Sequence, residues 1–203
     1  LYSAICHYPN VNEISRFGLT WSVVDRKTLN IDPVVEFTID KSYYNGHFYT
    51  DKAPGLSFLA VPAYFMYQKT LEPVFYSWMS AKISTEDQIG QIALDRLLHQ
   101  LKLWCTRALT VSLISAIFAV FLINYLEKIG GKTGKVLGFA YALGSMVYCY
   151  STVFYAHQLV AVMLFMAFFL AREKKDSGLF ISDFLPGFLI GLSFFFELPS
   201  LLI

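Results

Sequence analysis

The hydrophobic and polar positions of this chain divide it into a mixed first half and an apolar second half. Most of the Asp, Glu, Lys and Arg residues lie before residue 108, and the remainder contains long runs without a charge. The clearest run is Ala108–Tyr125, whose 18 uncharged residues approach the ~20 that a helix needs to cross a bilayer. With the later runs included, the pattern predicts transmembrane helices at about 108–125, 136–153, 155–171 and 180–203.

The longest apolar run, Val136–Ala171, contains no Asp, Glu, Lys or Arg and one histidine, His157. A single helix of 36 residues would be far longer than one crossing requires, because a helix rises ~1.5 Å per residue. The polar cluster between Tyr150 and Gln158 therefore predicts a turn between two crossings. Glu197 lies inside the last apolar run, where an acidic side chain is costly to insert and usually points into the protein interior.

Basic residues between the apolar runs predict the orientation of the chain. Three lysines follow the first run, and three basic residues follow the third: Lys128, Lys132, Lys135, Arg172, Lys174 and Lys175. The positive-inside rule places both loops in the cytoplasm, so the turn at His157 and the whole of segment 1–107 lie on the outer side.

Segment 1–107 is expected to be an extracytoplasmic loop that contains membrane-surface helices. Apolar residues at helical spacing predict a short amphipathic helix at Asn12–Val24. The TLNIDP and NGHFY stretches indicate extended or turn structure. The apolar run Ala53–Tyr67 is short and has two prolines, which favours an interfacial or re-entrant helix over a full crossing.

Composition narrows the class of protein. The 203 residues are 56% hydrophobic with a net charge of +1, so there is no basic face that would neutralise a row of phosphates, and a nucleic-acid partner is excluded. The three cysteines, Cys6, Cys105 and Cys149, form no CxxC pair and predict neither a zinc site nor a disulfide framework. The start at Leu1 and the end inside an apolar run lead us to expect a fragment of a longer all-α, polytopic transmembrane helix bundle.

Two stretches of the outer segment pair acid with base beside an apolar sequence. The first is NEISR, which contains Asn12, Glu13 and Arg16, and the second is YTDKAPG, which contains Asp51 and Lys52. An adjacent carboxylate and cation at a membrane surface would bind a lipid phosphate and activate an acceptor hydroxyl or amine. The competing interpretation is a solvated loop with incidental charges.

Together these motifs resemble the GT-C superfamily of polyprenyl-phosphate-sugar-dependent glycosyltransferases. The likeness is to the bacterial relatives of protein O-mannosyltransferases and of aminoarabinose transferases, the glycosyltransferase 39 and 83 groups. NEISRF with WSVVD and TLNID resembles the first outer loop, and NGHFYTDKAPGLSFLAVP resembles the second loop motif. YSTVFYAHQLVAVMLF and GLSFFFELPSLL resemble later helices of that group.

The resemblance implies an integral membrane hexosyl- or pentosyltransferase of the bacterial inner membrane, with its active site facing the periplasm or the outside. Its partners would be membrane lipids, a polyprenyl-phosphate-linked sugar and a protein, lipid or glycan acceptor. Transfer would be inverting: a carboxylate deprotonates the acceptor, the anomeric carbon is attacked, and the lipid phosphate leaves.

The resemblance also implies roles for individual residues. Glu13 matches the acid of the first motif, Lys52 the lysine that meets the donor phosphate, and Asp51 its acidic neighbour. Arg16 would be a second phosphate contact. His157 and Asp51 would be ligands of a divalent metal cation.

One position departs from the family pattern, since Asn12 stands where many relatives have the aspartate that acts as base. An amide cannot take a proton at neutral pH. Either Glu13, Asp40 or Asp51 supplies the base, or this branch uses another arrangement, or the chain is not an active transferase.

Two readings from other classes compete with the transferase. In a transporter or flippase, His157 and Glu197 would form part of a proton or substrate path within the bundle. In a noncatalytic membrane scaffold subunit, the outer motifs would not converge in space.

Overall fold

The computed structural model describes residues 1–4, 7–83, 87–172 and 180–198. It is 79% helical with 4% strand, which confirms the all-α class. Cys6, Lys174, Lys175 and the end of the last expected helix, 199–203, lie outside the described residues. The chain forms two compact units. The first comprises Leu1, Ser3–Asp51 and Ser57–Thr110, and the second Tyr2, Lys52–Leu56 and Val111–Ile203.

In the first unit, helix α1 (Val11–Trp21) occupies most of the predicted amphipathic segment. It begins at a capping box: the Asn10 side chain accepts from the backbone of Glu13, and the Glu13 side chain accepts from the backbone of Asn10. A π-helical turn, η2 (Ser22–Arg26), continues the helix. It ends at Lys27, whose φ of 56° is in the left-handed region. The sequence therefore defines both ends of this helix locally.

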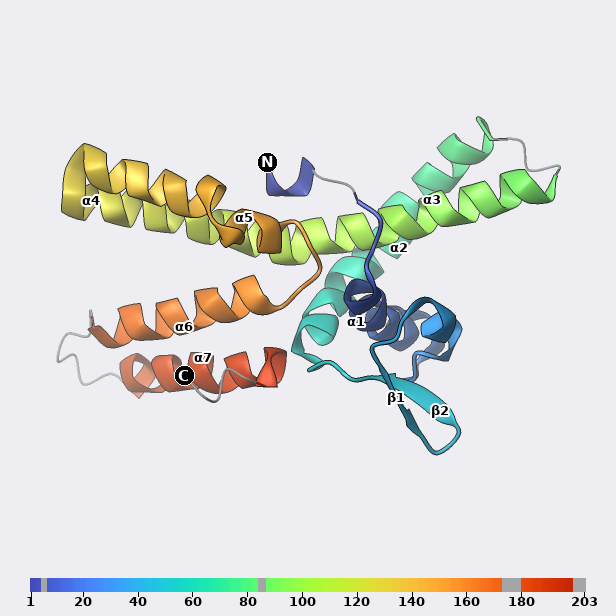
Figure 1. The fold of residues 1–203 in the computed structure, drawn as a ribbon, viewed down its shortest axis with the longest axis horizontal. Coiled ribbons are helices and arrows are strands. Elements are labelled where there is room, and N and C mark those ends of the chain that lie inside the picture. Colours follow the sequence, from blue (N-terminus) through green and yellow to red (C-terminus); the bar gives the residue numbers. More distant parts are fainter. Residues whose placement is uncertain (5–6, 84–86, 173–179, 199–203) are drawn as a thin grey trace. The chain divides into compact units, whose positions relative to one another are not determined.

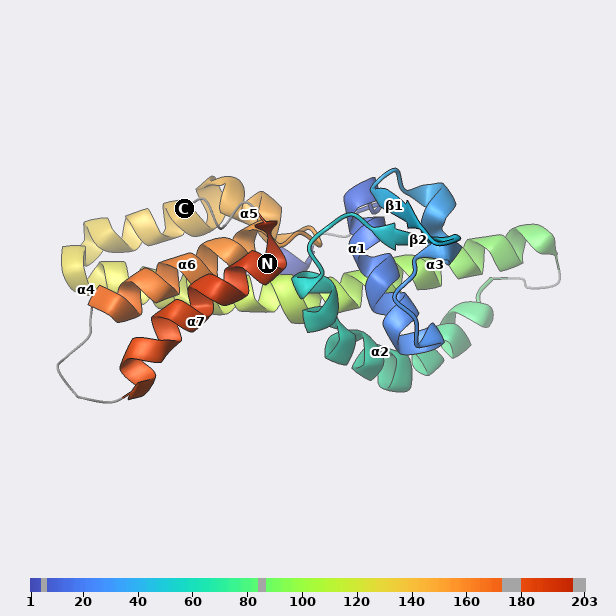
Figure 2. The same ribbon diagram turned by 90° about the horizontal axis from the view of Figure 1, so that it is seen from below.

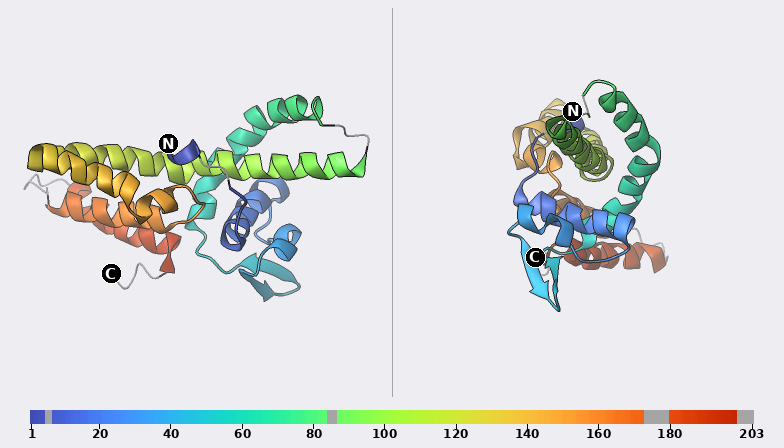
Figure 3. Two further views of the ribbon diagram at one scale, coloured as in Figure 1. Left: turned by 45° about the horizontal axis from the view of Figure 1, so that its top comes forward. Right: turned by 90° about the vertical axis from the view of Figure 1, so that its right-hand side faces the viewer.

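A two-stranded hairpin lies beside α1. Strands β1 (Lys41–Tyr44) and β2 (His47–Thr50) pair antiparallel, with Lys41 opposite Thr50. The connecting Asn45 and Gly46 both have positive φ, 48° and 86°, as Asn-Gly hairpin turns require. The short helix η3 (Asp32–Phe37) packs against α1, and Figures 1 and 3 show the hairpin as a ribbon that projects from this part of the chain.

Helix α2 (Gly55–Ser80) contains the expected interfacial segment but continues well past Tyr67. Two prolines, Pro62 and Pro73, lie inside this helix. Helix α3 (Gln88–Arg107) follows, with Met79 of α2 and Leu94 and Leu98 of α3 in one buried cluster. Phe17 of α1 contacts Tyr64 of α2 and His99 of α3, which makes it the centre of the unit.

After α3 come η4 (Ala108–Ser112), within which the second unit begins at Val111, and α4 (Leu113–Gly144). Gly131, with φ 58° and ψ −138°, interrupts α4, and the chain doubles back there as a helical hairpin (Figure 1). The two limbs meet at Gly134 and Gly138, where small residues allow close backbone approach. The connecting segment predicted at 127–135 is therefore mostly helical, with its turn confined to Gly130 and Gly131.

The expected helix 136–153 is divided at Ser145, which is extended and whose side chain accepts from Val147. After the short α5 (Met146–Ser151) and a turn come α6 (His157–Arg172) and α7 (Phe180–Phe196). Helices α6 and α7 pack side by side (Figure 2). The described chain thus has a turn immediately before His157, where the polar cluster predicted one.

One helix among the described residues, within Gln88–Gly144, is long and apolar enough by length and composition to cross a membrane. Two other apolar helices, His157–Arg172 and Phe184–Phe196, are shorter than such a span. Membrane association is therefore supported by one helix of the described chain.

Candidate functional site

Glu13 occupies a closed environment at the start of α1. Its side chain is 0% exposed, and Oε2 accepts from three donors: His7 Nε2 at 2.9 Å, Asn10 N at 3.2 Å and Asn10 Nδ2 at 3.1 Å. This carboxylate therefore orders the first turn of the helix as well as carrying a negative charge.

A histidine extends the contact to the end of α3. Arg107 Nη1 lies 3.0 Å from His7 Nδ1. A guanidinium only donates, so Nδ1 accepts and Nε2 carries the proton that Glu13 receives. Arg107 is 2% exposed, and a second bond, from Trp104 Nε1 to Ser3 O at 2.8 Å, holds the N-terminal segment against the same helix.

Arg16 lies one turn after Glu13 and is 2% exposed. Its Nε donates to Asn12 Oδ1 at 2.8 Å, so Asn12 is a hydrogen-bond partner of this arginine. Ser57 Oγ donates to Arg16 O at 2.8 Å and joins the start of α2 to α1. In this conformation Arg16 is a buried cation.

Ser15 connects α1 to both ends of the hairpin. Its hydroxyl donates to Asp40 O, just before β1, and lies 2.7 Å from the Thr50 hydroxyl at the end of β2. Since Ser15 has one proton, the Thr50 hydroxyl is the donor in the second bond. The NEISR motif and the start of the TDK motif therefore meet in the first unit, which the sequence did not predict from spacing.

The remaining acid and base candidates lie at the end of this hairpin. Asp40 is half-buried, with its backbone N–H donating to Thr38 Oγ1. Asp51 is exposed and follows Thr50 directly. Lys52 is the next residue and is half-buried, and it is grouped with the second unit.

In the second unit, His157 and Glu197 form a pair. His157 Nδ1 lies 3.6 Å from Glu197 Oε1, with 48% and 16% of the two side chains exposed. The rings of Tyr150 and Tyr155 contact the imidazole edge to face, with ring centroids 5.0 and 5.6 Å from its centroid. Residues 40 positions apart, at the start of α6 and just after α7, thus come together.

The proposed metal ligands do not form a metal-binding group within the described residues. No set of three or more His, Cys, Asp or Glu side chains able to hold an ion occurs there. Asp51 belongs to the first unit and His157 to the second. A cation bound by Asp51 and His157 remains an expectation of the resemblance.

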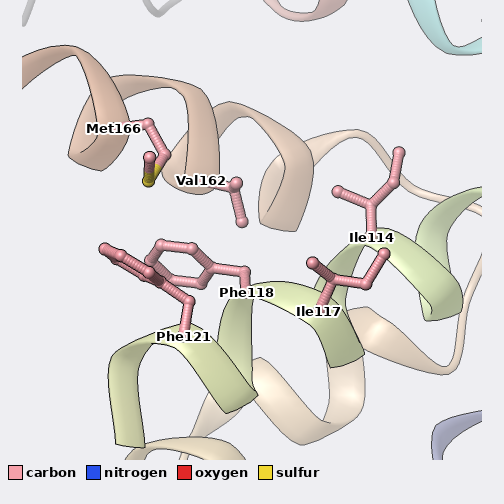
Figure 4. A pocket seen from close by; sticks show the side chains of 6 residues that line it. All are labelled: Ile114, Ile117, Phe118, Phe121, Val162 and Met166. Carbon is pink, nitrogen blue, oxygen red and sulfur yellow. The ribbon is translucent and has the colours of Figure 1, made fainter. Parts of the chain in front are cut away.

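An apolar groove of about 290 Å³ lies between the first limb of α4 and α6 (Figure 4). It is lined by Ile114, Ile117, Phe118, Phe121, Val162 and Met166. No polar side chain lines it, so it offers contact with hydrocarbon and no group for chemistry.

Two carboxylates near the hairpin and η2 have structural partners. Asp32 accepts from the Phe48 backbone N–H and from His47, both at 2.7 Å, and these bonds hold the pKa of its carboxyl below the usual value. Asp25 accepts from the Tyr64 hydroxyl at 3.0 Å. Burial, followed by the charge of Asp25, raises the pKa of the Tyr64 phenol.

Sequence reasoning missed His7 and Arg107. Arg107 directly precedes the first apolar run, and His7 precedes α1 by several residues. The available signal was the capping-box spacing of Asn10 and Glu13, which indicates a helix start and a bonded carboxylate. Nothing in the spacing brings residue 107 to residue 7.

Comparison of the chain with protein-family models, with curated proteins and with solved structures found no match.

Proposed function

We propose that the chain is part of an integral-membrane glycosyltransferase that moves a sugar from a polyprenyl-phosphate donor to an acceptor on the extracytoplasmic face. The observation that carries the proposal is the junction at Ser15, whose hydroxyl bonds to Asp40 and Thr50. Because of that junction, the NEISR motif and the start of the YTDKAPG motif are neighbours in the first unit, which a scaffold with unrelated loops does not require.

Burial assigns different roles to the acids. A general base must reach the acceptor proton within hydrogen-bond distance. Asp51 is exposed, whereas Glu13 is buried and its carboxylate accepts three hydrogen bonds. Asp51 is therefore the proposed base, with Asp40 the next candidate, and Glu13 holds the helix that presents the site.

The reaction is an inverting displacement. Asp51 takes the proton of the acceptor hydroxyl, whose oxygen forms the new bond to the anomeric carbon. The bond from that carbon to the phosphate oxygen breaks, and the lipid phosphate leaves with the electron pair. Lys52 compensates the negative charge that develops on the phosphate. Arg16 is a less direct phosphate ligand, because it is buried and bonded to Asn12.

The membrane arrangement belongs to the same proposal. Helices α4, α6 and α7 would cross the bacterial inner membrane as part of a polytopic bundle, with the glycine turn of α4 in the cytoplasm. The lysines around that turn support this orientation, including Lys135, which pairs with Glu127 at 3.1 Å. The hairpin and α1 would then face the periplasm.

The test is transfer of radiolabelled sugar from extracted polyprenyl-phosphate donors by the full-length purified protein. We expect Asp51→Asn to lower the transfer rate by about 10²-fold or more, the usual contribution of a general base, and Lys52→Ala to do the same. The controls are Asp95→Asn and Lys128→Ala, which change an exposed acid and an exposed base elsewhere.

Retention of transfer by both site variants, or its loss in both controls, would overturn the assignment of the site. A folded wild type that neither transfers the sugar nor hydrolyses any donor would overturn the function.

A proton-coupled transporter is the second candidate, and the His157–Glu197 pair favours it. Ionisable residues in transmembrane segments often belong to proton relays, and this pair lies at the start of α6 and directly after α7. In proteoliposomes, a transporter would lose proton-coupled uptake in Glu197→Gln and keep it in Asp51→Asn. A glycosyltransferase would instead lose sugar transfer in Asp51→Asn and keep it in Glu197→Gln.

A further inference from the structure

His7 joins two buried charged side chains that come from distant parts of the sequence. Its Nε2 lies 2.9 Å from Glu13 Oε2 at the start of α1, and its Nδ1 lies 3.0 Å from Arg107 Nη1 at the end of α3. Glu13 and Arg107 are 0% and 2% exposed, whereas the His7 side chain is 29% exposed. The histidine is therefore the member of the chain of bonds that solvent protons reach.

The bond to Arg107 selects one form of the ring. Arginine has no acceptor, so Nδ1 must present its lone pair, and the single proton of a neutral imidazole is then on Nε2. That proton points to the carboxylate of Glu13. Both contacts of His7 are satisfied together in this one neutral tautomer.

We propose that His7 is a positioning residue that holds the acid-bearing helix α1 against α3, and that protonation of its Nδ1 releases the contact with Arg107. The inference rests on the proposed function only in that Ser15 of α1 bonds to the hairpin that leads to the proposed site. Histidine is the side chain whose charge normally changes between about pH 5 and pH 8. Acidification of the outer compartment would therefore loosen this end of α1.

The charges around His7 set the sign of this effect. Glu13 faces the ring from α1 and Arg107 faces it from α3, and Arg16 lies one turn along α1. A protonated ring keeps its donor to Glu13 but turns a second N–H toward the guanidinium, which is a contact between two cations. The link to α1 survives, and the link to α3 is lost.

A second bond holds the same segment to α3 without a titrating group. Trp104 Nε1 donates to Ser3 O at 2.8 Å, and Trp104 lies one turn before Arg107. Trp104→Phe removes this bond and leaves the His7 contacts in place. It is therefore the matched control for loosening the segment without changing the response to pH.

The experiment compares wild type, His7→Gln, His7→Ala and Trp104→Phe in the full-length protein in nanodiscs. A glutamine amide has an acceptor oxygen and a donor nitrogen but does not titrate. We expect wild type and His7→Gln to have similar melting temperatures at about pH 8, with His7→Ala lower. Between about pH 8 and pH 5 the wild type should approach His7→Ala, while His7→Gln keeps its margin.

The ring form is read directly by ¹⁵N NMR of labelled histidine. The expected signal at about pH 8 is a protonated Nε2 and a bare Nδ1, assigned by its absence in His7→Gln. A protonated Nδ1 at that pH, or a His7→Ala variant as stable as wild type across the range, would overturn the proposal. Trp104→Phe should lower stability by the same amount at both ends of the range.

Transfer activity separates this inference from the proposed function. If wild type transfers sugar, its kcat/KM should fall about 10-fold or more on acidification relative to His7→Gln, because a small displacement of a site costs that much. If wild type shows no transfer while the stability and NMR results hold, the positioning role stands and the glycosyltransferase proposal fails.

Discussion

Two acidic residues of the first unit, Glu13 and Asp51, have different roles because they differ in burial, although both are carboxylates. Glu13 reads as an ordinary acid of a surface helix, yet its side chain is fully enclosed and bonded to His7 and Asn10. Asp51 has the same chemical type and remains exposed. The difference between the two acids decides which one is offered as a base and which one orders a helix.

Replacing Glu13 tests the structural role of the buried carboxylate. Glu13→Ala leaves the donors of His7 and Asn10 without their shared acceptor, so we expect a loss of about 2–3 kcal/mol in unfolding free energy. Glu13→Gln retains an acceptor oxygen and should lose less. Denaturant unfolding in detergent, followed by tryptophan fluorescence, measures both. Equal stability of Glu13→Ala and wild type would contradict the assigned role.

The pH response of Asp32 has a definite sign. Its folded pKa lies below the ordinary value, so its contribution to stability is present above about pH 4 and is lost as the pH falls through the folded pKa. The melting-temperature difference between wild type and Asp32→Asn should therefore be largest near neutrality and shrink under acid conditions. A difference that stays constant with pH would show that the charge of Asp32 contributes nothing.

At the scale of elements, the glycines of α4 determine how the most apolar part of the chain folds. Gly131 takes a positive φ, and Gly134 and Gly138 allow the returning limb to approach the first. A Cβ on Gly138 would lie 2.7 Å from Ile123 Cα, which is closer than carbon atoms pack. The turn and the close contact are both consequences of residues without side chains.

Gly138→Ala is expected to destabilise the helical hairpin by about 1–3 kcal/mol through overpacking. Gly144→Ala is the matched control, since a Cβ there meets nothing within 4 Å. Thermal unfolding in detergent should separate the two variants, with Gly144→Ala at or above the wild-type midpoint. A Gly138→Ala variant as stable as this control would mean that the limbs do not pack as closely as described.

At the scale of the whole molecule, the chain has an apolar unit and a unit rich in polar contacts. Within the described residues, one helix is apolar and long enough to cross a membrane. In the proposed topology, the positive-inside rule would place the glycine turn of α4 and the β hairpin on opposite sides of the membrane. That assignment determines which compartment supplies donor and acceptor in the proposed reaction.

Cysteine labelling in intact cells tests the orientation. In a background with Cys6, Cys105 and Cys149 replaced by alanine, Ser42→Cys on the exposed hairpin should react with an impermeant maleimide. Lys132→Cys beside the glycine turn should react only after the membrane is permeabilised. The opposite pattern would reverse the topology and remove the extracytoplasmic site.

Local patterns predicted much of the helical structure of this protein. The amphipathic period of Asn12–Val24 corresponds to α1, Asn45-Gly46 forms a hairpin turn within the NGHFY region, and Ala108–Tyr125 is helical throughout. These features depend on residues close in sequence. Helix α2 is longer than the apolar run Ala53–Tyr67 that predicts it, because the helix continues to Ser80 through a less apolar sequence. The division at Ser145 has no strong helix breaker to mark it.

The sequence by itself determined that the chain is helical and where its apolar runs lie. It also determined which acids and bases belong to the NEISR and YTDKAPG motifs. Only the tertiary structure decided which of these side chains meet. The bonds from His7 to Arg107, from Ser15 to Thr50 and from His157 to Glu197 join residues 100, 35 and 40 positions apart. The physical reason is that hydrophobic periodicity records burial along one element, whereas a contact between elements depends on how their surfaces pack, which no local pattern contains.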